Sequence, residues 1–267
     1  MTGGWSGGCI GGSILFEVAT DLALLLIAAA FVAGLVDAIA GGGGLITLPA
    51  LLLAGASPLQ ALATNKLQGS FGAASAVVSY GRAGQVRPGE QLGMALVSLI
   101  AGAGGALVAH AVPVAALRVV MPVVLIGIAG FFALKPGLTD EARVRRIGPA
   151  LFAVTAVPLI AAYDGFFGPG TGSFFMTAFV MLAGFGVLKA TAHTKMLNLA
   201  SNLGSLAVFA TSGATWWMIG LAMGAAQVLG AMIGARLAVR VGARVIKPLL
   251  VVTSAGMALR LLFQAFS

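Results

Sequence analysis

Two acidic residues, each followed by a glycine run, are the first groups in this sequence that can do chemistry. Asp37 precedes Gly41-Gly42-Gly43-Gly44, and Asp164 precedes Gly168-Pro169-Gly170-Thr171-Gly172. Glycine disfavours a helix by about 1 kcal/mol relative to alanine, so we expect unwound backbone that lines a protein-enclosed cavity. The helix after each run begins with free N–H groups, which favours an anion cradle. A tight turn for close packing, with the acids facing water, is the alternative.

Two lysines lie inside otherwise apolar segments, in Thr64-Asn65-Lys66 and in His193-Thr194-Lys195. A charge at the bilayer centre costs at least about 2.5–3.5 kcal/mol on insertion scales, so each lysine is a functional-site hypothesis. Lys66 lies about seven residues into its segment, hence about 10 Å deep, and Lys195 is expected at a similar depth from the other side, so that each lies about 5 Å from the midplane. Snorkelling of the side chains to the interface is the alternative.

These elements together predict a site for a small oxyanion, since they offer cationic donors, helix N-termini, amides and hydroxyls. We expect Asp37, Asp164 and His193 to be candidates for proton coupling, because burial and neighbouring charges change the proton affinity of such groups. His193 can equally donate directly to the anion. The predicted substrate-binding residues are Asn65, Lys66, His193, Thr194, Lys195, Asn198, Gly42, Gly43, Gly44, Gly170, Thr171 and Gly172.

The composition is that of an all-α polytopic membrane protein. Of 267 residues, 60% are hydrophobic and 8% are charged, against about a quarter charged in soluble domains. The single cysteine excludes a disulfide framework, and with two histidines it leaves too few ligands for a convincing metal centre. No catalytic or cofactor motif is visible, so we expect neither an enzyme nor a cofactor.

Ten apolar segments are predicted as membrane crossings. The second is too short to cross comfortably, and the first and seventh are marginal at about 15 residues. The segments run approximately over 22–36, 45–56, 59–80, 92–111, 115–134, 148–163, 172–186, 191–211, 216–235 and 247–266.

The basic residues predict the orientation. The loop between the fifth and sixth segments carries four positive charges and is therefore assigned to the cytoplasm. Ten crossings then place 11 of the 15 basic residues on that side and both termini outside, whereas re-entrant second and seventh segments would place residues 236–247 outside. The net charge of +8 thus indicates loop anchoring, not nucleic-acid binding. The 11 residues are Arg82, Arg87, Lys135, Arg143, Arg145, Arg146, Lys189, Arg236, Arg240, Arg244 and Lys247.

The chain also repeats itself. Asp37 aligns with Asp164 at an offset of 127, and Lys66 aligns with Lys195 at an offset of 129. We therefore expect a flexible tail (1–17), a five-segment repeat (18–134), a basic linker (135–145) and a second repeat (146–266). Because five is odd, the second repeat must be inverted in the membrane, and inverted repeats are typical of secondary transporters.

The run from Val36 to Pro49, followed by Asn65-Lys66, resembles the TauE/SafE sulfite exporter family, and the second-half motifs resemble the same signature. The resemblance implies a bacterial inner-membrane transporter of small sulfur-containing anions such as sulfite, sulfoacetate or related organosulfonates. It implies roles for the glycine loops and for the Asn65-Lys66 and Thr194-Lys195 pairs. The halves differ at Thr64/His193 and at Gly42/Pro169, so the site is expected to be only pseudo-symmetric.

The sequence therefore predicts a secondary transporter that works by alternating access, with H⁺ as the candidate coupling ion and the lipid bilayer as its surroundings. A passive anion channel that uses the same central cations is the alternative. A membrane enzyme or assembly factor lacks a supporting motif. Monomer and homodimer both stay open.

Overall fold

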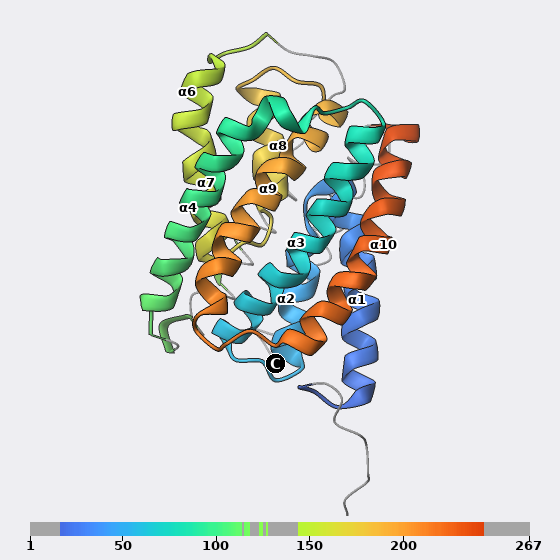
Figure 1. The fold of residues 1–267 in the computed structure, drawn as a ribbon, viewed down its shortest axis with the longest axis vertical. Coiled ribbons are helices and arrows are strands. Elements are labelled where there is room, and N and C mark those ends of the chain that lie inside the picture. The colour runs from blue at the N-terminus through green and yellow to red at the C-terminus, as the bar shows by residue number, and fades with distance from the viewer. Residues whose placement is uncertain (1–16, 114, 118–122, 125–126, 128–143, 243–267) are drawn as a thin grey trace, which may run out of the picture.

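The computed structural model describes residues 17–113, 115–117, 123–124, 127 and 144–242, which form a bundle of helices with no strand among them (Figure 1). The predicted tail 1–17 and linker 135–145 lie almost wholly outside these residues. Most of the predicted segment 115–134 and all of 247–266 lie outside them as well.

The described helices follow the predicted segments closely. The first half holds α1 (Thr20–Ala40), α2 (Gly43–Leu53), α3 (Pro58–Arg82), a short 3₁₀ helix η1 (Pro88–Gln91) and α4 (Leu92–Ala111). The second half holds α6 (Pro149–Val154), α7 (Ala156–Phe166), α8 (Thr171–Met181), α9 (Val187–Ala210) and α10 (Trp217–Val241).

The first helix of the second half is broken, whereas α1 is continuous over 21 residues. The single segment predicted over 148–163 divides at Thr155, whose φ of −117° and ψ of −71° depart from helical values. Pro158 explains the break, because proline has no N–H to donate to the carbonyl of Val154 and its ring clashes with that carbonyl.

Two helices are only half the length of a membrane crossing. α2 and α8 each have 11 residues, which corresponds to a rise of about 16 Å against a hydrocarbon core of about 30 Å. The predicted second and seventh segments are therefore too short to cross alone. The glycine run before each helix consequently lies well inside the bundle instead of at its end.

The bundle exposes large apolar side chains and buries charged ones, which is unusual for a water-soluble protein. Large apolar side chains such as Leu25, Leu96 and Leu159 are exposed, whereas Lys66 and Lys195 are fully buried. Among the described residues, four helical stretches are long and apolar enough to span a membrane: 20–40, 88–111, 149–166 and 217–241. This arrangement is expected where lipid surrounds the protein and polar groups face its interior.

The helices of the two halves pack mainly against one another. α1 lies along α10, and α4 lies along α7; α3 also packs on α10, and α9 packs on α4 (Figure 1). α3 and α9, which carry the two lysines, contact each other in the middle of the bundle. The bundle is therefore one interlocked unit.

Glycines allow the closest of these contacts. A Cβ on Gly105 of α4 would lie 2.0 Å from the carbonyl oxygen of Ala162 in α7, and a Cβ on Gly165 would lie 1.9 Å from that of Gly102. Gly104, the neighbour of Gly105, has nothing within 4 Å of such a Cβ. Small residues at helix crossings in membranes permit this backbone approach.

We therefore expect opposite results from two adjacent substitutions in α4. Gly105→Ala forces the α4–α7 contact apart and lowers the free energy of unfolding by about 1–3 kcal/mol. Gly104→Ala is neutral or stabilising by up to about 1 kcal/mol, because alanine favours a helix over glycine. Thermal unfolding of the detergent-purified protein measures both, and equal unfolding temperatures would show that the crossing tolerates a methyl group.

Candidate functional site

The two glycine runs meet at the centre of the bundle. Gly41 ends α1 with a φ of +79°, in the left-handed region that favours glycine. A Cβ at this position would lie 2.3 Å from the carbonyl carbon of Gly172. The hydroxyl of Ser173 donates to the carbonyl oxygen of Ala40 at 2.6 Å. The two runs therefore touch backbone to backbone, which only residues without a side chain allow.

Two buried ion pairs cross between the halves at this point. Lys66 Nζ lies 2.8 Å from Asp164 Oδ1, and the two side chains are 1% and 3% exposed. Lys195 Nζ lies 3.0 Å from Asp37 Oδ2 and also donates to the backbone carbonyl of Asp37. Each lysine is thus neutralised by the acid of the other half, whereas the sequence predicted the lysines as cationic donors to the substrate and did not predict this pairing.

The carboxylates have further donors. The hydroxyl of Ser201 donates to Asp164 Oδ2, and the N–H of Gly43 donates to Asp37 Oδ1 at 3.2 Å. A buried charge is costly unless it is paired and hydrogen-bonded, and both acids meet this condition. The amide of Gly43, predicted as a donor to substrate, is therefore occupied by Asp37 in this conformation.

Amide side chains surround the ion pairs. Asn65 Oδ1 accepts hydrogen bonds from Thr47 Oγ1 at 2.7 Å and from Gln68 Nε2 at 3.0 Å. The amide oxygens of Asn198 and Gln227 are buried and have no hydrogen-bond partner among the described residues. Both amide oxygens can therefore still accept a hydrogen bond beside the charged cluster.

The space between these groups is small. A cavity of about 30 Å³ lies at the cluster, where one water molecule needs about 10–15 Å³ on the same measure. It has no room for a sulfonate in this conformation. The cavity is lined by Asp37, Gly41, Gly44, Asn65, Gly69, Asp164, Gly168, Gly170, Gly172, Asn198, Asn202 and Gln227.

The predicted site residues thus divide into two groups. Asp37, Asp164, Asn65, Asn198 and the glycines 44, 170 and 172 line the cavity, and both lysines reach its acids. Two hydroxyls are used elsewhere, since Thr171 Oγ1 donates to the carbonyl of Gly168 at 2.6 Å and Thr194 Oγ1 donates to that of Ala190 at 2.8 Å. Gly42 caps the N-terminus of α2 but is not among the lining residues.

His193 lies apart from the central cluster. It precedes Lys195 by two positions on α9, and two helical positions are about 200° apart around the axis. Its ring packs edge-on against Phe185 with centroids 4.8 Å apart, and its Nδ1 lies 2.9 Å from the carbonyl oxygen of Lys189. The structure therefore places this predicted ligand in a different pocket, at the end of the bundle where α9 begins.

Two cluster residues were missed in the sequence. Gln227 is the lone amide of α10 and lies in a run, 217–235, whose other residues are apolar or glycine, and this isolation was the signal that could have found it. Gly34 and Gly72 make room for it, because a Cβ on either would lie 2.8 Å from Gln227 Cγ. Nothing in the sequence indicated that Ser201 belongs to the cluster, apart from its position six residues after Lys195.

Apolar helices around a buried, paired-charge cluster define a multi-pass membrane protein whose chemistry lies at its centre. The family model described as Sulfite exporter TauE/SafE matches residues 26–261. The chain therefore belongs to the TauE/SafE sulfite exporter family, which confirms the family predicted from its motifs.

The relatives of this chain are named as membrane transporters. The probable membrane transporter protein ORF9 of Sinorhizobium sp is 55% identical over 246 residues, which cover 92% of this chain and 94% of the relative. The probable membrane transporter protein YfcA of Escherichia coli K12 is 43% identical, with 94% and 93% covered. A probable membrane transporter protein of Haemophilus influenzae is 39% identical, with 93% and 97% covered. No solved structure gave a significant match.

Proposed function

We propose that this membrane transporter is a secondary transporter of small sulfur-containing oxyanions, such as sulfite, sulfoacetate or related organosulfonates. It works by alternating access in the bacterial inner membrane, and H⁺ is the coupled ion. The observation that carries the proposal is the crossed pairing of Lys66 with Asp164 and of Lys195 with Asp37.

Crossed pairing supports two inverted repeats. In a two-fold arrangement, if residue i of one half contacts residue j of the other, then j of the first contacts i of the second. Asp37 and Asp164 are equivalent in the sequence repeat, as are Lys66 and Lys195, so the two ion pairs satisfy this rule. The packing of α1 on α10 and of α7 on α4 satisfies it as well. Swapping the conformations of two such halves gives alternating access.

The aspartates occupy the place that an anionic substrate needs. A sulfonate or sulfite oxygen makes charge-assisted hydrogen bonds with a lysine much as a carboxylate does. The anion therefore enters by displacing a carboxylate from its lysine, and the amides of Asn198 and Gln227, which have unpartnered oxygens, adjust around it. The cavity of about 30 Å³ must widen for this step, so the structure corresponds to a conformation in which the site is closed.

Displacement also provides the coupling to protons. A carboxylate left in the interior without its cation is strongly destabilised, and protonation relieves this cost. One ion pair plus one anion and one proton then gives a lysine–anion pair and a neutral acid. The acid whose lysine has taken the substrate is the proton carrier, with Asp37 and Asp164 as the two candidates.

Transport of labelled sulfoacetate and sulfite into proteoliposomes, with and without an imposed pH gradient, tests this proposal. We expect accumulation above equilibrium that requires the gradient and is abolished in Lys66→Met and Lys195→Met. Arg240→Met removes an exposed charge from the end of α10 and should transport like the parent protein. Lysine-dependent flux that only dissipates the anion gradient would show a channel. No flux of either anion would reject the proposed substrates.

A further inference from the structure

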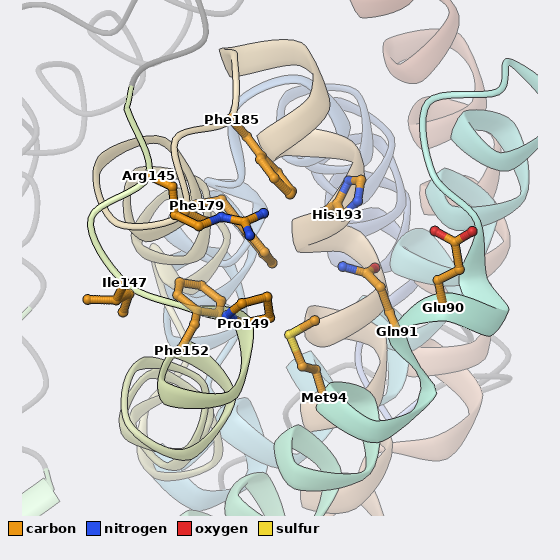
Figure 2. A pocket seen from close by; sticks show the side chains of 11 residues that line it. Glu90, Gln91, Met94, Arg145, Ile147, Pro149, Phe152, Phe179, Phe185 and His193 are labelled. Carbon is orange, nitrogen blue, oxygen red and sulfur yellow. The ribbon is translucent and has the colours of Figure 1, made fainter.

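A second pocket lies near the end of the bundle where α4, α6 and α9 begin (Figure 2). Its polar lining comes from Gln91, Arg145, His193 and Glu90, and its apolar wall includes Phe152 and Phe179. The cavity measures about 160 Å³, and an engineered cavity of about 150 Å³ binds a benzene molecule. The pocket therefore has room for one small organic molecule, which the central cavity does not.

Gln91 indicates that this pocket is built for a polar ligand. Its side chain is 3% exposed, and neither its amide oxygen nor its amide nitrogen has a hydrogen-bond partner among the described residues. Figure 2 shows the amide pointing into the pocket. Leaving a buried polar group unpaired costs about 1–3 kcal/mol, so an apolar side chain would be more stable here unless a ligand or an ordered water uses the amide.

The surrounding groups favour an anionic head group. The guanidinium of Arg145 points into the pocket in Figure 2 and can bind an oxyanion through two parallel N–H groups. His193 Nδ1 faces a carbonyl oxygen and so carries a proton, which leaves Nε2 as an acceptor or, when the ring is charged, a second donor. Glu90 at the rim of the pocket carries a negative charge, which opposes the binding of an anion. Arg87 compensates this charge, because its Nη1 lies 3.1 Å from Glu90 Oε1.

The aromatic wall of the pocket determines what kind of body the ligand carries beside its anionic head group. The rings of Phe152 and Phe179 contact each other with centroids 4.7 Å apart, and Phe179 stacks on Phe185. Such a wall stabilises an alkyl body by burying it, at about 25 cal/mol per Å² of apolar surface, and offers nothing to a bare inorganic anion.

We propose that this pocket is a second anion site, separate from the central lysines, which binds a small organic anion: a sulfonate or carboxylate head group on Arg145 and Gln91, and a short alkyl body against the phenylalanines. It lies at the end that the charge pattern assigns to the cytoplasm. Binding here needs neither transport nor the central ion pairs.

Calorimetric titration of the purified full-length protein in detergent with 1-propanesulfonate, butyrate and sulfate, at equal ionic strength, tests the site. We expect saturable binding of one or both organic anions and none of sulfate. Gln91→Leu and Arg145→Gln should each weaken binding at least tenfold, and Arg240→Gln should leave it unchanged. Gln91→Leu should also raise the unfolding temperature of the ligand-free protein, so misfolding cannot account for its loss of binding.

A variant without the central charges separates this site from the proposed transport site. Lys66→Met/Asp164→Asn should bind 1-propanesulfonate with unchanged affinity if the ligand lies in the pocket of Figure 2. Loss of binding in that variant would place the ligand at the central cluster and overturn the proposal. Failure of either organic anion to bind the parent protein, or full affinity in both Gln91→Leu and Arg145→Gln, would overturn it as well.

Discussion

Lys66→Met abolishes anion flux and lowers the free energy of unfolding by about 3–5 kcal/mol, the usual cost of removing one partner from a buried ion pair. The reason is the burial of Asp164, which is 3% exposed and, among the residues that the structure describes, keeps only the hydroxyl of Ser201 as a donor once its lysine is gone. Lys195→Met has the same effect on flux but a smaller effect on stability, because Asp37 is 15% exposed and water can reach it. Thermal unfolding and proteoliposome uptake measure the two effects separately.

A double variant distinguishes a role in transport from a role in stability. Lys66→Met/Asp164→Asn removes both charges, and asparagine can still accept the hydrogen bond from Ser201, so stability should return close to that of the parent protein. Flux should stay absent, because no cation is left to hold the anion. Wild-type flux in this double variant would mean that Lys66 serves only to neutralise Asp164.

Gly172→Ala separates the two glycine runs and stops transport. Its Cβ would lie 2.5 Å from the Cα of Gly41 and 2.8 Å from the carbonyl oxygen of that residue, so one backbone has to move. Overpacking of this kind costs about 1–3 kcal/mol, and here it also displaces the segments that carry Asp37 and the start of α8. We expect a lower unfolding temperature and flux below a tenth of that of the parent protein.

Gly41→Ala and Gly55→Ala show whether backbone strain or the clash is responsible. Gly41 has a φ of +79° and meets the backbone of Gly172, whereas Gly55 has a φ of +92° and open space around its Cβ position. Both substitutions carry the cost of a left-handed alanine, about 1–2 kcal/mol, but only Gly41→Ala adds the clash. Equal unfolding temperatures and equal flux in the two variants would contradict close contact between the runs.

The sequence was sufficient to find the charged residues of the central cluster, because acids and lysines in apolar segments are conspicuous in a membrane protein. It did not identify their partners. Depth along a segment follows from residue counting, but whether a lysine faces an aspartate or an empty site depends on how the halves interlock. For this reason Lys66 and Lys195 were expected as donors to the substrate, and their pairing with Asp164 and Asp37 was not expected.

Errors of orientation have a similar origin. His193 and Thr194 were grouped with Lys195 by proximity in the sequence, yet neighbouring positions on a helix face different directions. His193 accordingly lies in the pocket with Gln91, and the hydroxyl of Thr194 bonds within α9. The helices themselves were predicted well where apolar runs were long. The division between α6 and α7 was missed, because the apolar pattern continues through Thr155 while the backbone does not.

The pairing of two lysines with two aspartates determines what the membrane voltage can act on. The two lysines and two aspartates together have no net charge, and the cluster stays neutral when each negative charge of the substrate enters with one proton, as proposed above. A voltage of 100 mV does about 2.3 kcal/mol of work on each net charge that crosses, and a neutral cycle moves none. Transport would therefore be driven by the pH difference across the membrane and would not depend on the membrane voltage.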